Sequence, residues 1–182
     1  ISEYGSSNEN VARITLQTHE LTKVTNLGSD AKEQLFLAAN EISHRLASAQ
    51  SAALELQKMV EDQTRQIEAG EHLREGRGVE LPFIPSLQIL FEGYYYNLKN
   101  VIRDLGGTPM KILYGKRFEE ASCWFSFKDG KEADVSKHLR RLENSNHAGY
   151  STVRELIDRN RDNFRHIISI RNAIEHPGGS AG

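Results

Sequence analysis

The sequence RNAIEHP at residues 171–177 joins a permanent cation, an amide and an imidazole directly before a proline. Arginine can hold a phosphate through two parallel hydrogen bonds at any working pH, and histidine can give or take a proton near neutrality. This set suits the cleavage of RNA by attack of a 2′-hydroxyl on the adjacent phosphate. In that reaction His176 would move the proton, Arg171 would stabilise charge on the phosphoryl oxygens, and Asn172 would orient one of them. We therefore take Arg171, Asn172 and His176 as the candidate catalytic residues.

An arginine followed by a histidine four to six residues later is too common to carry weight by itself. A spacing in this range occurs in three other pairs: Arg13 with His19, Arg141 with His147, and Arg161 with His166. Requiring asparagine directly after the arginine leaves Arg171 to His176 alone. In an all-helical chain, this longer pattern resembles the motif of the HEPN family, helical domains found in prokaryotic toxins, abortive-infection systems and RNA-processing ribonucleases. The resemblance covers Arg171 to His176.

The HEPN resemblance implies a metal-independent endoribonuclease of the toxin or antiviral-defence type, which needs no metal and no cofactor. It also implies a homodimer with a composite cleft, in which Arg171 of one chain lies near His176 of the other. RNA is then the substrate, and an antitoxin or an effector-sensing domain is a further kind of partner.

The spacing within the motif agrees with a composite site. In a continuous helix, residues five apart leave the axis about 140° apart, so one helix does not easily bring Arg171 and His176 together. Pro177 disfavours the α region for His176, which lets the imidazole swing away from the last turn. The carboxyl end of a helix also favours a cationic imidazole. The alternative is structural: Arg171 pairs with Glu175 on the surface, and His176 only ends the helix.

Basic residues are concentrated in one part of the chain. The net charge of −2 gives no global field that would attract nucleic acid, but eight basic residues against four acids lie between Lys137 and Arg171. From this set we expect Arg140, Arg141, Arg161 and Arg165 to bind RNA, although a solvated charged face is the alternative. Because Arg171 continues an apolar line along its helix, we expect its guanidinium to be buried or at an interface and to need an anion.

Length and composition fit one soluble helical domain over residues 1–182. Cys123 is the only cysteine, so no internal disulfide can form, and its neighbours Trp124 and Phe125 indicate a buried thiol. A reducing, cytoplasmic setting is therefore expected. The chain starts at Ile1 without an initiator methionine, which we interpret as trimming or processing.

Hydrophobic periodicity predicts an all-α bundle built around a long heptad-patterned helix pair. The first helix is expected over residues 29–70, opened by a capping box of Asp30 and Glu33. Its apolar seam repeats in steps of four and three and comprises Leu35, Ala39, Ile42, Leu46, Ala49, Ala53, Leu56, Val60, Gln63 and Ile67. At 1.5 Å per residue this helix is roughly 60 Å long, so its far end should pack on a second protomer or stand as an arm, unless an intrachain hairpin covers it.

The other elements are less regular. A second core helix is expected at residues 86–105, after an exposed connection from Gly70 to Pro85 that reverses the chain. Residues 108–150 form an irregular insertion with a small β-hairpin around Asp129-Gly130 and a short basic helix at 135–142. The motif lies on a final helix over 151–176 that opens with Thr152 and Glu155 as a capping box. Residues 11–27 favour a helix without excluding a strand.

Two alternative functions remain open from the residues. One is a non-catalytic helical module that dimerises or binds a partner through the heptad seam, and the other is a nucleotide-binding HEPN-like domain that does not cut. Glu41 and His44 have the spacing of a di-iron ligand pair, but no second pair accompanies them. Of the consecutive tyrosines 94–96, two should be core and one exposed, where it could stack on a base.

Overall fold

The computed structural model describes residues 8–70, 86–126, 131–144 and 150–177. Its regular elements are α1 (Glu9–Val24), α2 (Ser29–Glu68), α3 (Leu87–Gly106), α4 (Thr108–Tyr114), the 3-10 helix η1 (Ala121–Trp124), α5 (Asp134–Glu143), α6 (Tyr150–Arg159) and α7 (Arg161–Glu175). No strand occurs in these ranges, so the predicted all-α fold is confirmed.

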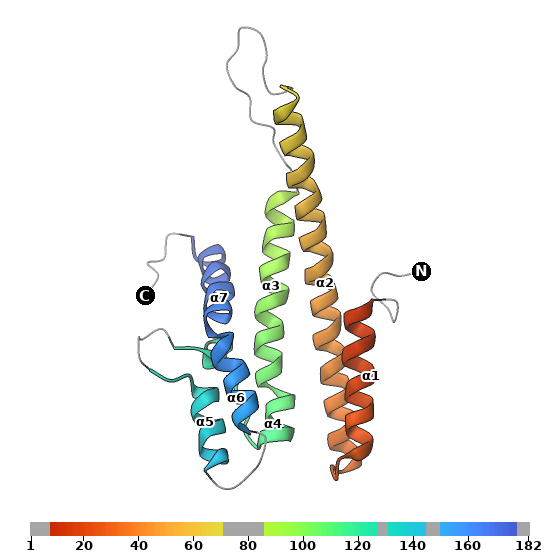
Figure 1. The fold of residues 1–182 in the computed structure, drawn as a ribbon, viewed down its shortest axis with the longest axis vertical. Helices are drawn as coiled ribbons and strands as arrows, with labels where there is room; N and C mark the ends of the chain where they lie inside the picture. The colour runs from red at the N-terminus through yellow and green to blue at the C-terminus, as the bar shows by residue number, and fades with distance from the viewer. Residues whose placement is uncertain (1–7, 71–85, 127–130, 145–149, 178–182) are drawn as a thin grey trace.

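The helices form a layered bundle around α3. α2 runs antiparallel to both α1 and α3, and it packs against each of them (Figure 1). α7 packs on α3 on the side away from α2, while α5 and α6 pack on each other below it (Figure 1). The predicted pairing of the two long helices is therefore present, and α3 is the element that connects the long hairpin to the motif-bearing helix.

The long helix α2 spans Ser29–Glu68, close to the predicted 29–70. The predicted capping box is wrong, because the N-cap is Gly28 and no side chain caps the helix. Along the predicted seam, Leu35, Ala39, Ile42 and Ala49 are buried, whereas Val60 and Ile67 are exposed. The seam is therefore covered only along its first part in the single chain, where α1 and α3 flank it, and the far end of α2 stands beyond the bundle (Figure 1).

The main core lies at the end of the bundle that contains α4, α5 and α6, the lower end in Figure 1. It gathers side chains from α3, α4, η1, α5, α6, α7 and the residues on either side of η1, namely Ile102, Met110, Phe118, Ala121, Trp124, Phe125, Val135, Leu139, Ile157 and Ile168. The predicted β-hairpin is wrong over the described residues: the apolar run from Met110 to Tyr114 lies in α4, and Cys123 lies in η1. Pro109 in the first turn and a left-handed Gly115 just after Tyr114 give this short run a helix start and a helix stop. Asp129 and Gly130 lie outside the described residues, whereas the predicted basic helix is α5.

The predicted final helix is two helices, α6 and α7, divided at Asn160. The Asn160 side chain donates a hydrogen bond to the carbonyl of Leu156, and asparagine competes in this way with the helical backbone. The break lets α6 pack against α5 while α7 packs against α3. A single straight helix could not follow both neighbours, and the apolar spacing along 151–176 does not reveal the change in direction.

Two glycines of α3 have opposite surroundings. A Cβ on Gly106 would lie 2.7 Å from the carbonyl oxygen of Phe118, whose own amide donates to the Gly106 carbonyl. A Cβ on Gly93 would meet nothing within 4 Å. The segment that carries Phe118 into the core therefore requires glycine at position 106 but not at position 93.

We expect Gly106→Ala to lower the free energy of unfolding by roughly 1–3 kcal/mol, because the added methyl group would overpack against backbone. Gly93→Ala should raise it by about 0.5–1 kcal/mol, since alanine is the better residue inside a helix. Denaturant unfolding of both variants checks this. Equal effects of the two substitutions would contradict the close approach at Gly106.

Candidate functional site

Arg171 faces α3 and is largely buried, as the sequence predicted. Its side chain is 14% exposed, and its guanidinium lies 5.5 Å from the ring centroid of Tyr96 on α3. Its Nη2 forms an ion pair at 2.8 Å with Glu175, one turn further along α7. The structural alternative is thus present in the single chain, where Glu175 supplies the anion that a shielded guanidinium needs.

Lys99 on α3 connects the other polar groups of the motif. Its Nζ donates hydrogen bonds to Oδ1 of Asn172 at 3.2 Å and to Oε2 of Glu175 at 2.8 Å. Together with Arg171, it places two cations on a single carboxylate. The hydrogen bond from Lys99 holds the pKa of Glu175 below its usual range, and the charges of Lys99 and Arg171 act in the same direction. Glu175 is therefore ionised at neutral pH, and the cluster keeps one positive charge in excess.

His176 lies at the exposed end of α7. Its backbone has φ −129° and ψ 65°, outside the α region, which confirms the predicted effect of Pro177. The His176 amide still donates to the carbonyl of Asn172. Within the described part of the chain its imidazole makes no hydrogen bond, so one chain brings Arg171 and Asn172 together with Lys99 but leaves the imidazole open to solvent.

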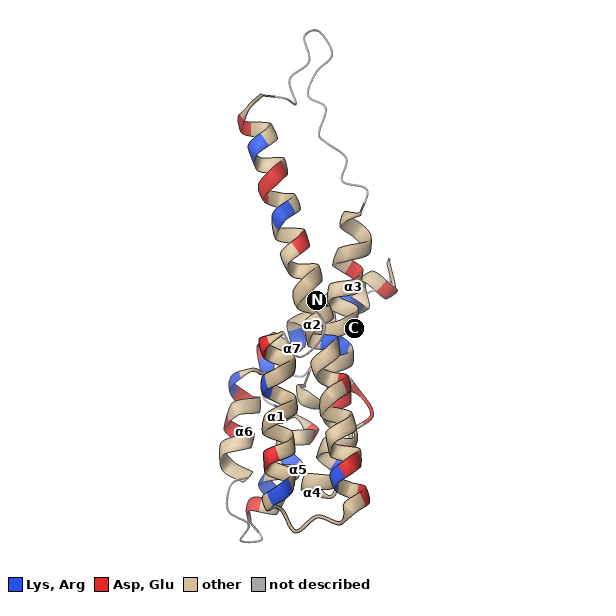
Figure 2. Cartoon of the chain, turned by 90° about the vertical axis from the view of Figure 1, so that its right-hand side faces the viewer, with Lys and Arg blue, Asp and Glu red and all other residues tan. Residues whose placement is uncertain are grey.

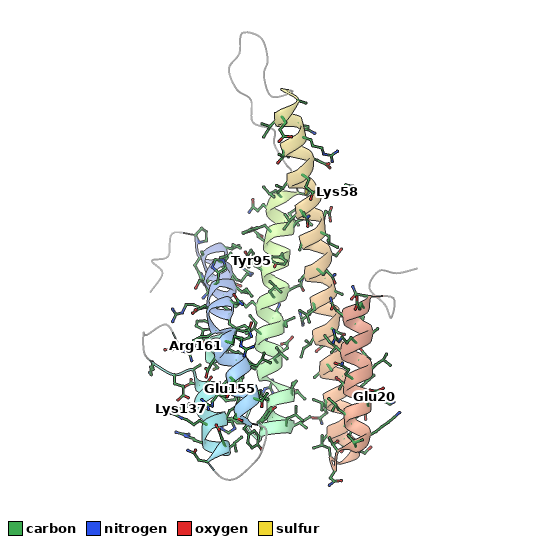
Figure 3. The ribbon with its side chains drawn as sticks, in the orientation of Figure 1. Glu20, Lys58, Tyr95, Lys137, Glu155 and Arg161 are labelled. Carbon is green, nitrogen blue, oxygen red and sulfur yellow. The ribbon has the colours of Figure 1, made fainter. Side chains whose placement is uncertain are left out.

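A hollow of about 270 Å³ opens beside the guanidinium of Arg171. Its other walls are Ile89, Glu92, Gly93 and Tyr96, all on α3. Tyr96 is 50% exposed, as predicted for one of the three consecutive tyrosines, whereas Tyr94 and Tyr95 are only partly buried and do not belong to the core. Figure 3 shows Tyr95 on α3 at the height of α7, so the aromatic segment of α3 and the end of the motif helix lie side by side.

The four arginines predicted to bind RNA are spread over two helices, and three of them have partners. Arg140 pairs with Glu132 at 2.5 Å, Arg161 pairs with Asp158 at 2.7 Å, and Arg165 donates to the carbonyl of Ser126. Arg141 is exposed on α5 and has no ion-pair partner among the described residues. Figure 3 shows the basic residues Lys137 and Arg161 on different helices, and in the view of Figure 2 acids alternate with bases along the far half of α2. RNA binding by these four arginines stays a prediction.

The sequence did not identify Lys99 or its link to the motif. Tyr96 and Lys99 are three residues apart and therefore share a face of α3, but nothing in the sequence states that this face meets α7. The contact depends on where α3 and α7 cross, and that is set by the packing of the core below the site.

Other candidate centres are weaker. Burial raises the pKa of the Cys123 thiol, which is only partly buried, so this residue is a neutral thiol at neutral pH. Glu41 and His44 are both exposed on α2. Over the ranges that the structure describes, no group of three or more His, Cys, Asp or Glu side chains is placed to hold a metal ion.

Comparisons with protein-family models, with curated proteins and with solved structures find no match for this chain. Among the described helices, none combines the length and the apolar character needed to cross a membrane. The assignment of a function therefore depends on the geometry of the motif and its neighbours.

Proposed function

We propose that this chain is a metal-independent endoribonuclease of the HEPN type, acting as a homodimer in the cytoplasm. The observation that supports this most is the convergence of Arg171 and Lys99 on one carboxylate beside Asn172. Two cations and an amide around a single anion are groups that also bind a phosphate. In the proposed complex an RNA phosphate takes the place of the Glu175 carboxylate.

The proposed reaction follows from these positions. Arg171 and Lys99 stabilise negative charge on the phosphoryl oxygens, and Asn172 orients one of them. An imidazole removes the proton from the 2′-hydroxyl or supplies one to the leaving 5′-oxygen. The 2′-oxygen forms the new bond to phosphorus while the bond to the 5′-oxygen breaks, so the products carry a 2′,3′-cyclic phosphate and a 5′-hydroxyl.

A second chain supplies the imidazole in this proposal. Arg171 is turned inward against α3, whereas His176 has left the helical conformation and lies exposed at the helix end. A symmetric pair of chains can bring His176 of one protomer to Arg171 of the other. Each dimer then contains two composite clefts.

Mixing the variants Arg171→Ala and His176→Ala tests the composite cleft. Each variant alone should be inactive, whereas the mixture should regain RNA cleavage, because one of the two clefts in a mixed dimer has both residues. As a matched control, either variant mixed with the double variant contains no complete cleft and should stay inactive. Inactivity of the first mixture, with exchange of chains shown by mass, would contradict a composite site.

The exposed far end of α2 favours a second candidate function, an interaction module. Val60 and Ile67 are exposed and seven residues apart, so they lie on one face of the helix. If this face binds a second copy, Val60→Glu should lower the mass in solution without lowering the melting temperature. Gln66→Glu, which adds the same charge off this face, is the control. If Val60→Glu leaves the mass unchanged, this face of α2 is not the interface.

A further inference from the structure

Along α3, no contact with a described neighbour requires the glycine at position 93. Gly93 is in the second turn of this helix, and a Cβ placed there would meet nothing within 4 Å. Glycine inside a helix is about 1 kcal/mol less favourable than alanine. Packing within the described chain gives no reason for the glycine here. What the missing side chain does is leave room in the hollow beside Arg171.

The walls of this hollow suit a flat, partly polar ring. Ile89, Gly93 and Tyr96 follow each other in steps of four and three, so they form one stripe along α3. Tyr96 at one end is half exposed and Ile89 at the other end is 73% exposed. Glu92 adds a carboxylate that can accept hydrogen bonds, and Arg171 adds a cation. The volume of about 270 Å³ is slightly below that of pockets for drug-sized ligands, which suits a single base.

We propose that this hollow is a nucleobase subsite that holds a base of single-stranded RNA next to the phosphate bound by Arg171. The base lies in the space over Gly93, with a face against Tyr96 and an edge towards Glu92. A carboxylate in this position accepts from an exocyclic amino group, so the subsite prefers bases that carry one. This inference rests on the proposed function, because Arg171 is the group that connects the phosphate with the hollow.

Binding of short RNA can separate the contribution of the base from that of the phosphate backbone. The probes are a single-stranded oligonucleotide and the same oligonucleotide with abasic positions, which keeps its phosphates. Tyr96→Leu and Gly93→Leu should each weaken binding of the base-containing probe roughly tenfold, the usual effect of losing one stacked base. Binding of the abasic probe should hardly change. Tyr96→Phe keeps the ring and should retain most of the binding that Tyr96→Leu loses, whereas Gly93→Ala adds only one methyl group to the space for the base and should weaken binding less than Gly93→Leu.

Each failure has a separate meaning. Binding that responds as expected without any cleavage would leave the subsite standing and remove the ribonuclease. Cleavage that is unaffected by Tyr96→Leu and Gly93→Leu would overturn the subsite and leave the ribonuclease. Equal loss for the abasic probe would show that these residues act on the backbone, and it would overturn the subsite. A failure to bind either probe would also overturn the subsite. A fall in the mass in solution with Gly93→Leu would overturn it too, because the hollow would then be a contact with a second copy of the chain.

Discussion

Replacing His176 with alanine is expected to lower the rate of RNA cleavage by roughly 10²–10⁴-fold, the usual contribution of a positioned acid or base. RNA affinity should remain close to that of the unmodified chain, because the imidazole is exposed at the end of α7 and Arg171 and Lys99 stay in place. The fold should also be unaffected. Single-turnover cleavage and equilibrium binding measured on the same RNA separate the two effects.

The chain offers a matched control for His176. His166 is exposed on the same helix and follows Arg161 with the spacing of the bare pattern, but no asparagine follows that arginine. His166→Ala should therefore retain cleavage. Equal losses of RNA cleavage for His166→Ala and His176→Ala would mean that the longer motif, Arg171 to His176, does not mark the catalytic residues.

Replacing Arg171 with alanine should reduce both cleavage and RNA affinity. Loss of one group that stabilises the developing charge typically costs roughly 10²–10³-fold in rate. Arg171→Lys should recover little activity, because an ammonium restores the charge without the two parallel hydrogen bonds. Glu175 keeps its hydrogen bond to Lys99 in both variants, so no carboxylate is left unpaired beside α3. Rates and affinities for the two variants, compared with thermal melting, check that the loss is not a loss of fold.

Glu175→Gln tests the same cluster of charged groups with the opposite expected change in RNA affinity. The carboxylate of Glu175 pairs with Lys99 and Arg171, the two cations that would hold a phosphate. Replacing the carboxylate with an amide leaves both cations available to the phosphate. RNA affinity should therefore rise, and the rise should be larger at low salt, since contacts with phosphate are screened by ions. A fall in affinity would indicate that Glu175 positions Arg171 for its substrate instead of competing with it.

The fold was predictable where a long periodic pattern dominated. The unbroken spacing from Leu35 to Ile67 predicted α2 to within two residues, and the second core helix predicted at 86–105 matches α3 to within one residue at each end. The predicted helix over 151–176 missed a bend, because the break at Asn160 follows from packing against two different neighbours. No strand of the predicted hairpin occurs in the described residues, because short apolar runs, such as Met110 to Tyr114, fit a helix as well as a strand.

The candidate site was predictable only in the part that is continuous in sequence. The burial of Arg171 and the non-helical backbone of His176 followed from the apolar line of the helix and from Pro177. Lys99 and Tyr96 lie more than seventy residues before the motif, and only the crossing of α3 and α7 brings them to it.

Incubation of the purified chain with single-stranded RNA in EDTA, followed by identification of the new ends, is the most direct test of a metal-independent ribonuclease. Cleavage should persist in EDTA, leave 2′,3′-cyclic phosphate and 5′-hydroxyl ends, and disappear with His176→Ala. Cleavage that stops in EDTA, or that leaves a 3′-hydroxyl, would contradict the proposed mechanism.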